Sequence, residues 1–176
     1  MRIKYLRLGL ITLLLVLLQG VAFNRLHLFS VATPYLFVYL IIKLPIGMSR
    51  FWVLLLSFLT GFLLDILTDT PGLNAGTLTL IAMLRPIAIA IFLPKDIQRS
   101  YVPSVKMTGT MPFWYYTAVI VAVHHIFLIL AELFSFVDFK FMLLRIIFST
   151  LLTLVLLALI ELLTGEMLRS KHKPIR

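Results

Sequence analysis

The sequence predicts an all-α integral membrane protein with six transmembrane helices. Three observations support this fold class: the apolar composition, six separated apolar segments, and the distribution of Lys and Arg between the predicted loops. Hydrophobic residues make up 61% of the 176 residues and charged residues 13%, and the mean hydropathy is +1.08. A soluble core cannot bury that much apolar surface, whereas a bilayer solvates a helix on every side.

The apolar segments set the predicted elements, because about 20 residues of helix cross a hydrocarbon core about 30 Å thick. The predicted spans are residues 8–23, 31–44, 51–67, 73–93, 113–136 and 141–165. The second span is short, so we expect it to extend upstream or to let Lys43 snorkel, with Pro34 in its first turn. Residues 94–112 are predicted to be a polar cytoplasmic linker and residues 166–176 a cytoplasmic tail of this single membrane domain.

The basic residues predict the orientation of these spans. With the N-terminus inside, twelve Lys and Arg residues fall on one side of the membrane, against Arg25 and Lys140 on the other. The side with more Lys and Arg is the cytoplasm, so both termini are predicted to be cytoplasmic. The formal net charge of +9 then reflects orientation rather than nucleic-acid binding.

Several ionisable residues lie inside the predicted spans, where an unpaired charge is costly. They are Asp65, Arg85, Glu132, Arg145 and Glu161. From the direction of each span, we expect Arg145 to pair with Glu132 or Asp65 in the outer half, and Arg85 to pair with Glu161 in the inner half. We interpret these pairs as ties that fix the fold or join subunits, in preference to a transport pathway.

Two adjacent histidines, His124 and His125, lie near the middle of the fifth span. They point about 100° apart on a regular helix, so they cannot both bind one metal ion from one face. Neutral imidazoles that hydrogen-bond within the bundle are favoured over a proton relay. No metal or cofactor is predicted, and the absence of cysteine excludes thiolate chemistry.

Small residues recur every four positions on the third and fourth spans. Ser57, Gly61 and Asp65 share one face of the third span, and Gly72 and Gly76 repeat the spacing at the start of the fourth. Small side chains let helix backbones approach closely. This face is predicted to pack the two spans as a hairpin or to contact a partner.

One enzyme signature is matched in part. Gly61, Asp65 and Asp69 match the tail of the motif of CDP-alcohol phosphotransferases, which hold two divalent cations with further upstream carboxylates. Residues 41–58 contain no Asp or Glu. We therefore predict a protein that is not an enzyme, and keep a membrane lipid head-group transferase as an alternative.

Residues 19–86 resemble the rod shape-determining MreD family. The matching features are Asn24 after the first span, Pro34 opening the second, and Pro45 ending the apolar run 35–44. They continue with the Gly-Phe-Leu-Leu-Asp sequence at 61–65 and the Pro-Gly-Leu-Asn-Ala-Gly sequence at 71–76.

This resemblance implies a scaffold in the bacterial inner membrane that helps to maintain cell shape. Such a protein contacts MreC, and through it the actin homologue MreB and the glycosyltransferase and transpeptidase that extend peptidoglycan. The resemblance also implies a bundle similar to the substrate-binding components of energy-coupling-factor transporters, which leaves a bound lipid or small molecule open. A vitamin-transporter component is the second hypothesis, although residues 10–18 lack the small-residue docking face of that class.

Overall fold

The computed structural model describes residues 14–17, 19, 32–95, 102–132 and 139–164. After a short helical stretch at residues 14–17, the elements are η2 (Leu36–Val38), α2 (Tyr39–Lys43), α3 (Arg50–Thr68), α4 (Leu73–Phe92), α5 (Val105–Thr108), α6 (Thr110–Glu132) and α7 (Phe139–Leu163). Within the described ranges, four helices are long and apolar enough to cross a membrane: α3, α4, α6 and α7. The chain therefore has the build of a helical membrane protein.

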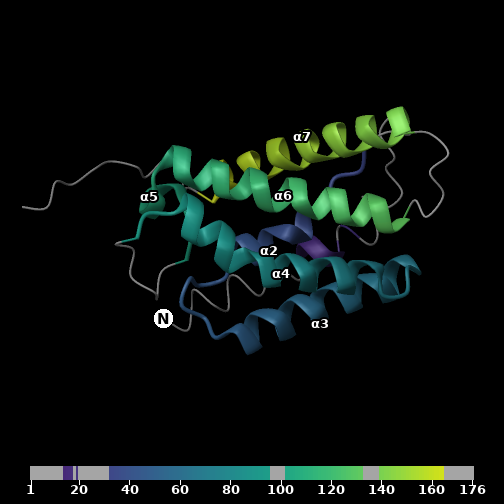
Figure 1. Ribbon diagram of the computed structural model, residues 1–176, viewed down its shortest axis with the longest axis horizontal. Helices are drawn as coiled ribbons and strands as arrows, with labels where there is room; N and C mark the ends of the chain where they lie inside the picture. The colour runs from purple at the N-terminus through teal and green to yellow at the C-terminus, as the bar shows by residue number, and fades with distance from the viewer. Residues whose placement is uncertain (1–13, 18, 20–31, 96–101, 133–138, 165–176) are drawn as a thin grey trace, which may run out of the picture.

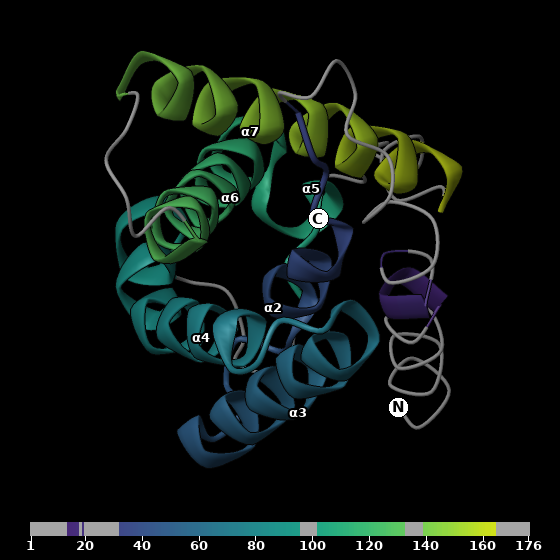
Figure 2. The ribbon, with the colours of Figure 1, turned by 90° about the vertical axis from the view of Figure 1, so that its right-hand side faces the viewer.

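The four long helices run roughly along the long axis of the molecule (Figure 1). Each long helix packs on the next long helix along the chain: α3 on α4, α4 on α6, and α6 on α7. The central segment, residues 32–44, lies between the α3–α4 pair and the α6–α7 pair (Figure 2). Phe37, Ile41 and Ile42 of this segment are completely buried, so the core of the bundle is built around it.

The central segment corrects the predicted second span. Residues 32–35 are not helical, and only the 3-10 turn η2 and the five-residue α2 follow them. Pro34 therefore precedes the helix instead of lying in its first turn. Of the first predicted span, only residues 14–17 and 19 lie in the described part of the chain.

The irregular backbone at residues 33–36 is stabilised by distant side chains. The backbone N–H of Thr33 donates to Ser149 Oγ and that of Tyr35 to Thr153 Oγ1, both at 3.1 Å. The Gln19 amide donates to Pro34 O at 2.8 Å and accepts from the N–H of Leu36 at 3.2 Å. Non-helical backbone at membrane depth is tolerated only when protein groups or cavity water satisfy it, and these bonds meet that need.

A tight turn joins α3 to α4. The N–H of Leu73 donates to Thr70 O, with Pro71 at the second position of the turn and Gly72 at the third. Gly72 has φ +79° and ψ −6°, the left-handed conformation that the third position of a type II turn requires. Asp69, also left-handed at φ 55°, ends α3.

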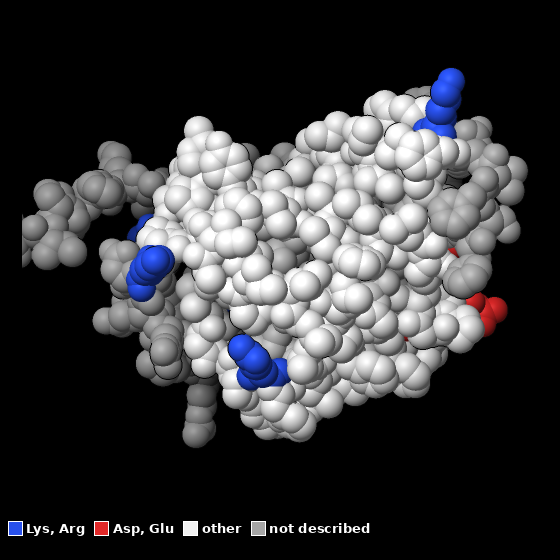
Figure 3. Space-filling model, in the orientation of Figure 1, with Lys and Arg blue, Asp and Glu red and all other residues white. Residues whose placement is uncertain are grey.

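Large apolar side chains are exposed on α3, α4 and α7, including Phe58, Ile87 and Leu151. Such a surface is unusual in water and ordinary in lipid. On the face shown in Figure 3, most basic side chains lie on the α5 side, one lies at the opposite end with the acidic oxygens, and the broad surface between them is uncharged.

Candidate functional site

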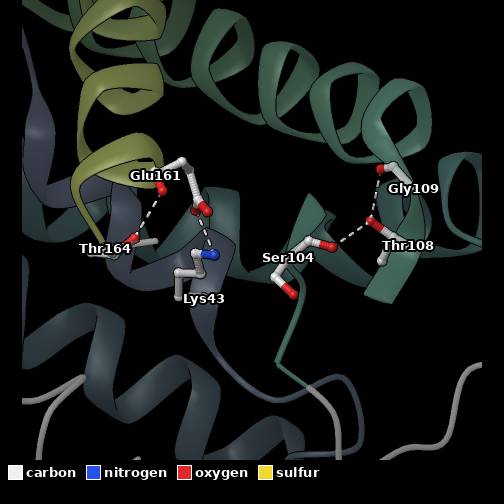
Figure 4. Close-up of polar contacts among 6 residues, drawn as sticks. All are labelled: Lys43, Ser104, Thr108, Gly109, Glu161 and Thr164. Carbon is white, nitrogen blue, oxygen red and sulfur yellow. Dashed lines mark hydrogen bonds and ion pairs between the residues drawn. The ribbon is translucent and has the colours of Figure 1, made fainter. Parts of the chain in front are cut away.

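A charged cluster at the α5 end joins four helices to one another. Lys43, the last residue of α2, pairs with Glu161 of α7 at 2.5 Å, and both side chains are buried (Figure 4). The Lys43 ammonium also lies 5.0 Å from the ring centre of Phe113 on α6. The expectation that Lys43 snorkels to the membrane surface is therefore wrong.

Arg85 of α4 belongs to the same cluster. The sequence predicted that it pairs with Glu161, but in the structure it does not. Its Nε donates to the Tyr116 hydroxyl of α6 at 3.1 Å, and its Nη2 donates to the backbone carbonyl of Leu44. The carbonyls at the end of a helix lack intrahelical donors, and a cation there also complements the helix dipole. Because α2 ends between α4 and α7, Lys43 pairs with the Glu161 carboxylate, and Arg85 donates to the Leu44 carbonyl.

The buried charges of this cluster are two cations and one anion among the described residues. Removing charges from water is expensive, so a buried ion pair is weak evidence of net stabilisation. The ion pair does fix the position of α2, since a misplaced α2 would separate the Lys43 ammonium from the Glu161 carboxylate. We interpret the charged cluster as the anchor of the central segment.

The second predicted tie lies at the opposite end of the bundle. Arg145 of α7 pairs with Glu132 of α6 at 2.9 Å, and 38% of the Glu132 side chain is exposed. Glu132 is one of the two partners expected from the sequence. Asp65, the other, is held in the α3–α4 turn.

Asp65 caps the N-terminus of α4. Its Oδ1 accepts from the N–H of Asn74 and its Oδ2 from the N–H of Ala75, both at 2.9 Å. The side chains of Asn74 and Thr70 also donate to Oδ1, each at 3.0 Å. The first N–H groups of a helix have no internal acceptor, and a carboxylate satisfies them and complements the helix dipole. Gly72, at the N-cap position, has no side chain that could do this.

The predicted small-residue face divides into a buried and an open part. A Cβ on Gly61 would lie 2.5 Å from the Ala75 Cα, so α3 and α4 touch through their backbones there. Ser57 is also buried and donates to Val53 O at 2.7 Å. Gly76 is exposed, and a Cβ there would meet nothing within 4 Å. A Cβ on Gly72 would likewise meet nothing within 4 Å, and glycine is needed there for the positive φ of the turn.

The contacts of Asp65 also bear on the alternative that the chain is a metal-dependent lipid head-group transferase. Both carboxylate oxygens of Asp65 are occupied by N–H and O–H donors, whereas Asp69 is exposed at the end of α3. The described ranges contain no group of three His, Cys, Asp or Glu side chains that could hold a metal ion. The Asp65 carboxylate thus builds the turn, and the partial signature match has a structural explanation.

A central polar cluster lies where α6 and α7 face residues 33–36. His125 Nδ1 is 2.8 Å from Val121 O, and its Nε2 is 3.2 Å from Thr153 Oγ1. Because a carbonyl only accepts, Nδ1 carries the hydrogen, and Nε2 of the neutral ring accepts from Thr153. The Thr153 hydroxyl is also 2.8 Å from Ser149 O, so its one hydrogen is shared between two acceptors while it receives the N–H of Tyr35.

His124 differs from its neighbour. It is completely buried, and neither ring nitrogen has a hydrogen-bond partner among the described residues. Its ring centre lies 5.7 Å from that of Tyr35, 5.4 Å from that of Phe37 and 5.6 Å from that of His125. The expectation of hydrogen-bonded imidazoles therefore fits His125 and is wrong for His124.

Several residues of these clusters were not singled out from the sequence. Ser149 and Thr153 are polar residues spaced by four between Arg145 and Glu161 of the sixth span, and Gln19 is the one amide of its span, so their polarity was the available signal. Pro45 lies two residues after the end of α2, and its carbonyl oxygen accepts from the N–H of Met48 at 3.2 Å. Asn24 lies outside the described residues.

Comparison of the chain with protein-family models, with curated proteins and with solved structures found no match in any of the three.

Proposed function

We propose that this chain is a non-enzymatic scaffold of the bacterial cell-wall elongation machinery, similar to MreD. It would act in the inner membrane through lateral helix contacts with MreC, and through MreC on MreB and the peptidoglycan-synthesising enzymes. The proposal rests first on the resemblance of residues 19–86 to that family. It is supported by what the resembling residues do in the fold.

The observation that supports it best is the division of the α3–α4 hairpin into a closed and an open face. Gly61 and Asp65 hold the two helices together at backbone contact and at the cap of α4. Gly76, the last residue of the resembling sequence at 71–76, is exposed with open space around it. A rigid hairpin that presents a glycine in a span is suited to close approach by another transmembrane helix.

The chemistry of the buried groups favours a scaffold over the lipid head-group enzyme. The Asp65 carboxylate is used by four hydrogen bonds within the hairpin. Lys43 and Glu161 neutralise each other inside the bundle. Neither group is presented to a substrate at the surface.

The direct test is purification from bacterial membranes in a mild detergent, with the neighbours identified by mass spectrometry. We expect an MreC-type protein to be recovered with the wild-type chain. Gly76→Leu should reduce that recovery several-fold because the side chain fills the open face. Ala90→Leu is the matched control, since Ala90 is also exposed on α4 near its other end.

Two outcomes would contradict the proposal. Recovery of a transporter ATPase in place of the wall-synthesis proteins would favour the vitamin-transporter component. Equal loss of the partner in Gly76→Leu and Ala90→Leu would show that the contact does not depend on the open face at Gly76.

A further inference from the structure

His124 presents an unmet chemical requirement in the middle of the bundle. A neutral imidazole has one N–H donor and one nitrogen acceptor, and both of these atoms are buried without partners among the described residues. A buried polar group that makes no hydrogen bond costs on the order of 1–3 kcal/mol in proteins, and two such atoms share one ring here. Native proteins meet such costs with a bound molecule or ordered water.

The surroundings of His124 supply a second, independent observation. The two aromatic rings nearest to it, apart from His125, belong to Tyr35 and Phe37. These residues flank the place where the second apolar segment changes from extended backbone to the 3-10 turn η2. Irregular backbone at membrane depth occurs where it is buried in protein or lines a cavity, and broken helices near the midplane commonly form binding sites. The orphaned imidazole thus faces the break.

The neighbouring polar groups cannot supply the missing bonds. His125 uses Nδ1 for Val121 O and Nε2 for Thr153. Thr153 already serves the N–H of Tyr35 and the carbonyl of Ser149. With these groups occupied, the neighbouring described residues leave no donor and no acceptor for His124.

We infer that His124 binds a small, uncharged molecule through a hydroxyl group, between α6 and residues 35–37. A hydroxyl both donates and accepts through one atom, which matches the two complementary nitrogens of a neutral imidazole. A charged group is disfavoured, because the charges that act on the neighbouring Tyr35, those of Arg145 and Glu132, already pair with each other and leave no counter-charge for it. The hydroxyl belongs either to a buried water molecule or to a small organic molecule, and the experiment separates these sources.

The experiment uses the full chain, labelled with ¹⁵N-histidine, in lipid nanodiscs. The chain has four histidines, and comparison with His124→Phe assigns the ring nitrogens of His124. If the phenylalanine variant does not fold, the combined variant His27→Gln, His125→Gln and His172→Gln leaves His124 as the one labelled imidazole. We expect ¹⁵N shifts of a hydrogen-bonded imidazole and a cross-peak from the ring N–H to an exchangeable hydroxyl or water proton. Nitrogen shifts typical of an unbonded imidazole would overturn the inference.

Two further measurements complete the test. Native mass spectrometry identifies an organic ligand as an added mass that His124→Phe loses, whereas the cross-peak without an added mass identifies water. His124→Phe should lower the melting temperature, because it removes bonds to the occupant. A higher melting temperature would mean that an empty site had been relieved of two orphaned atoms, and would contradict the inference. Thr117→Val, two turns away on α6, is the control and should retain the His124 signals.

Discussion

The carboxylate of Asp65 accepts the backbone N–H of Ala75 across the α3–α4 turn, at 2.9 Å. One helix thereby supplies the N-terminal cap of the next. At the same level, Gly61 lets the backbone of α3 approach Ala75 directly. The turn is held by a charge-assisted bond and a steric fit that depend on each other, because either one places Ala75 where the other needs it.

Gly61→Ala should destabilise the protein. The new Cβ would lie 2.5 Å from the Ala75 Cα and 2.6 Å from Asn74 O, and backbone atoms of this kind do not move without separating the helices. Overpacking of this type costs about 1–3 kcal/mol, seen as a lower melting temperature in detergent. Gly76→Ala is the matched control: its Cβ meets open space, and alanine favours a helix, so the melting temperature should stay equal or rise. Equal losses in the two variants would contradict the close approach at Gly61.

Asp65→Ala should cost about 1–2 kcal/mol, since it removes the cap of α4 and leaves two buried N–H groups without an acceptor. Asp65→Asn keeps one acceptor oxygen and should cost less. Asp69→Asn should be close to neutral, because Asp69 is exposed and asparagine tolerates its left-handed conformation. If Asp65→Asn and Asp69→Asn instead abolished a metal-dependent turnover without loss of thermal stability, the enzyme hypothesis would replace the scaffold.

Lys43→Met and Glu161→Gln should each destabilise the bundle, because each leaves the other charge buried without its partner. The expected cost is about 3–5 kcal/mol for each single variant. The double variant should cost much less than the sum, which a double-mutant cycle measures from thermal or denaturant unfolding. Additive losses would show that the 2.5 Å pair contributes no coupling.

The coupling free energy between Arg85→Gln and Glu161→Gln should be smaller than the coupling free energy between Lys43→Met and Glu161→Gln. Arg85 bonds to Tyr116 and to the Leu44 carbonyl, and it has no ion pair with Glu161. Tyr116→Phe should couple to Arg85→Gln, because the Tyr116 hydroxyl accepts from Arg85 Nε. A larger coupling of Arg85 to Glu161 than to Tyr116 would restore the pairing that the sequence suggested.

Thr153→Val should destabilise the break in the second apolar segment. It removes the acceptor of the Tyr35 N–H and the partner of His125 Nε2 together, at a cost of about 1–3 kcal/mol for the groups left unsatisfied. Thr153→Ser retains the hydroxyl and should keep most of the stability. Hydrogen exchange of the Tyr35 amide gives a local readout, and it should accelerate in the valine variant only.

The α3–α4 hairpin could be predicted closely, because its information is local. The Pro71-Gly72 turn and the spacing of Gly61 and Asp65 lie within one pair of spans, and small residues in apolar helices favour close packing whatever surrounds them. The central segment could not be predicted. Its irregular backbone depends on Ser149 and Thr153, which are 116 and 118 residues from the groups they bind.

Composition and segment length are enough to predict an apolar, helical membrane protein, because they decide whether hydrocarbon can solvate a helix. The positions of Arg85, Arg145 and Glu161 within the spans also indicated that these charges need partners, whereas Lys43 was not recognised as one of them. Which charges meet depends on how the helices pack, because depth along a span does not give the distance between helices. Lys43 therefore pairs with Glu161, Arg85 binds a helix end, and His124 lies beside the break without a hydrogen-bond partner among the residues that the structure describes.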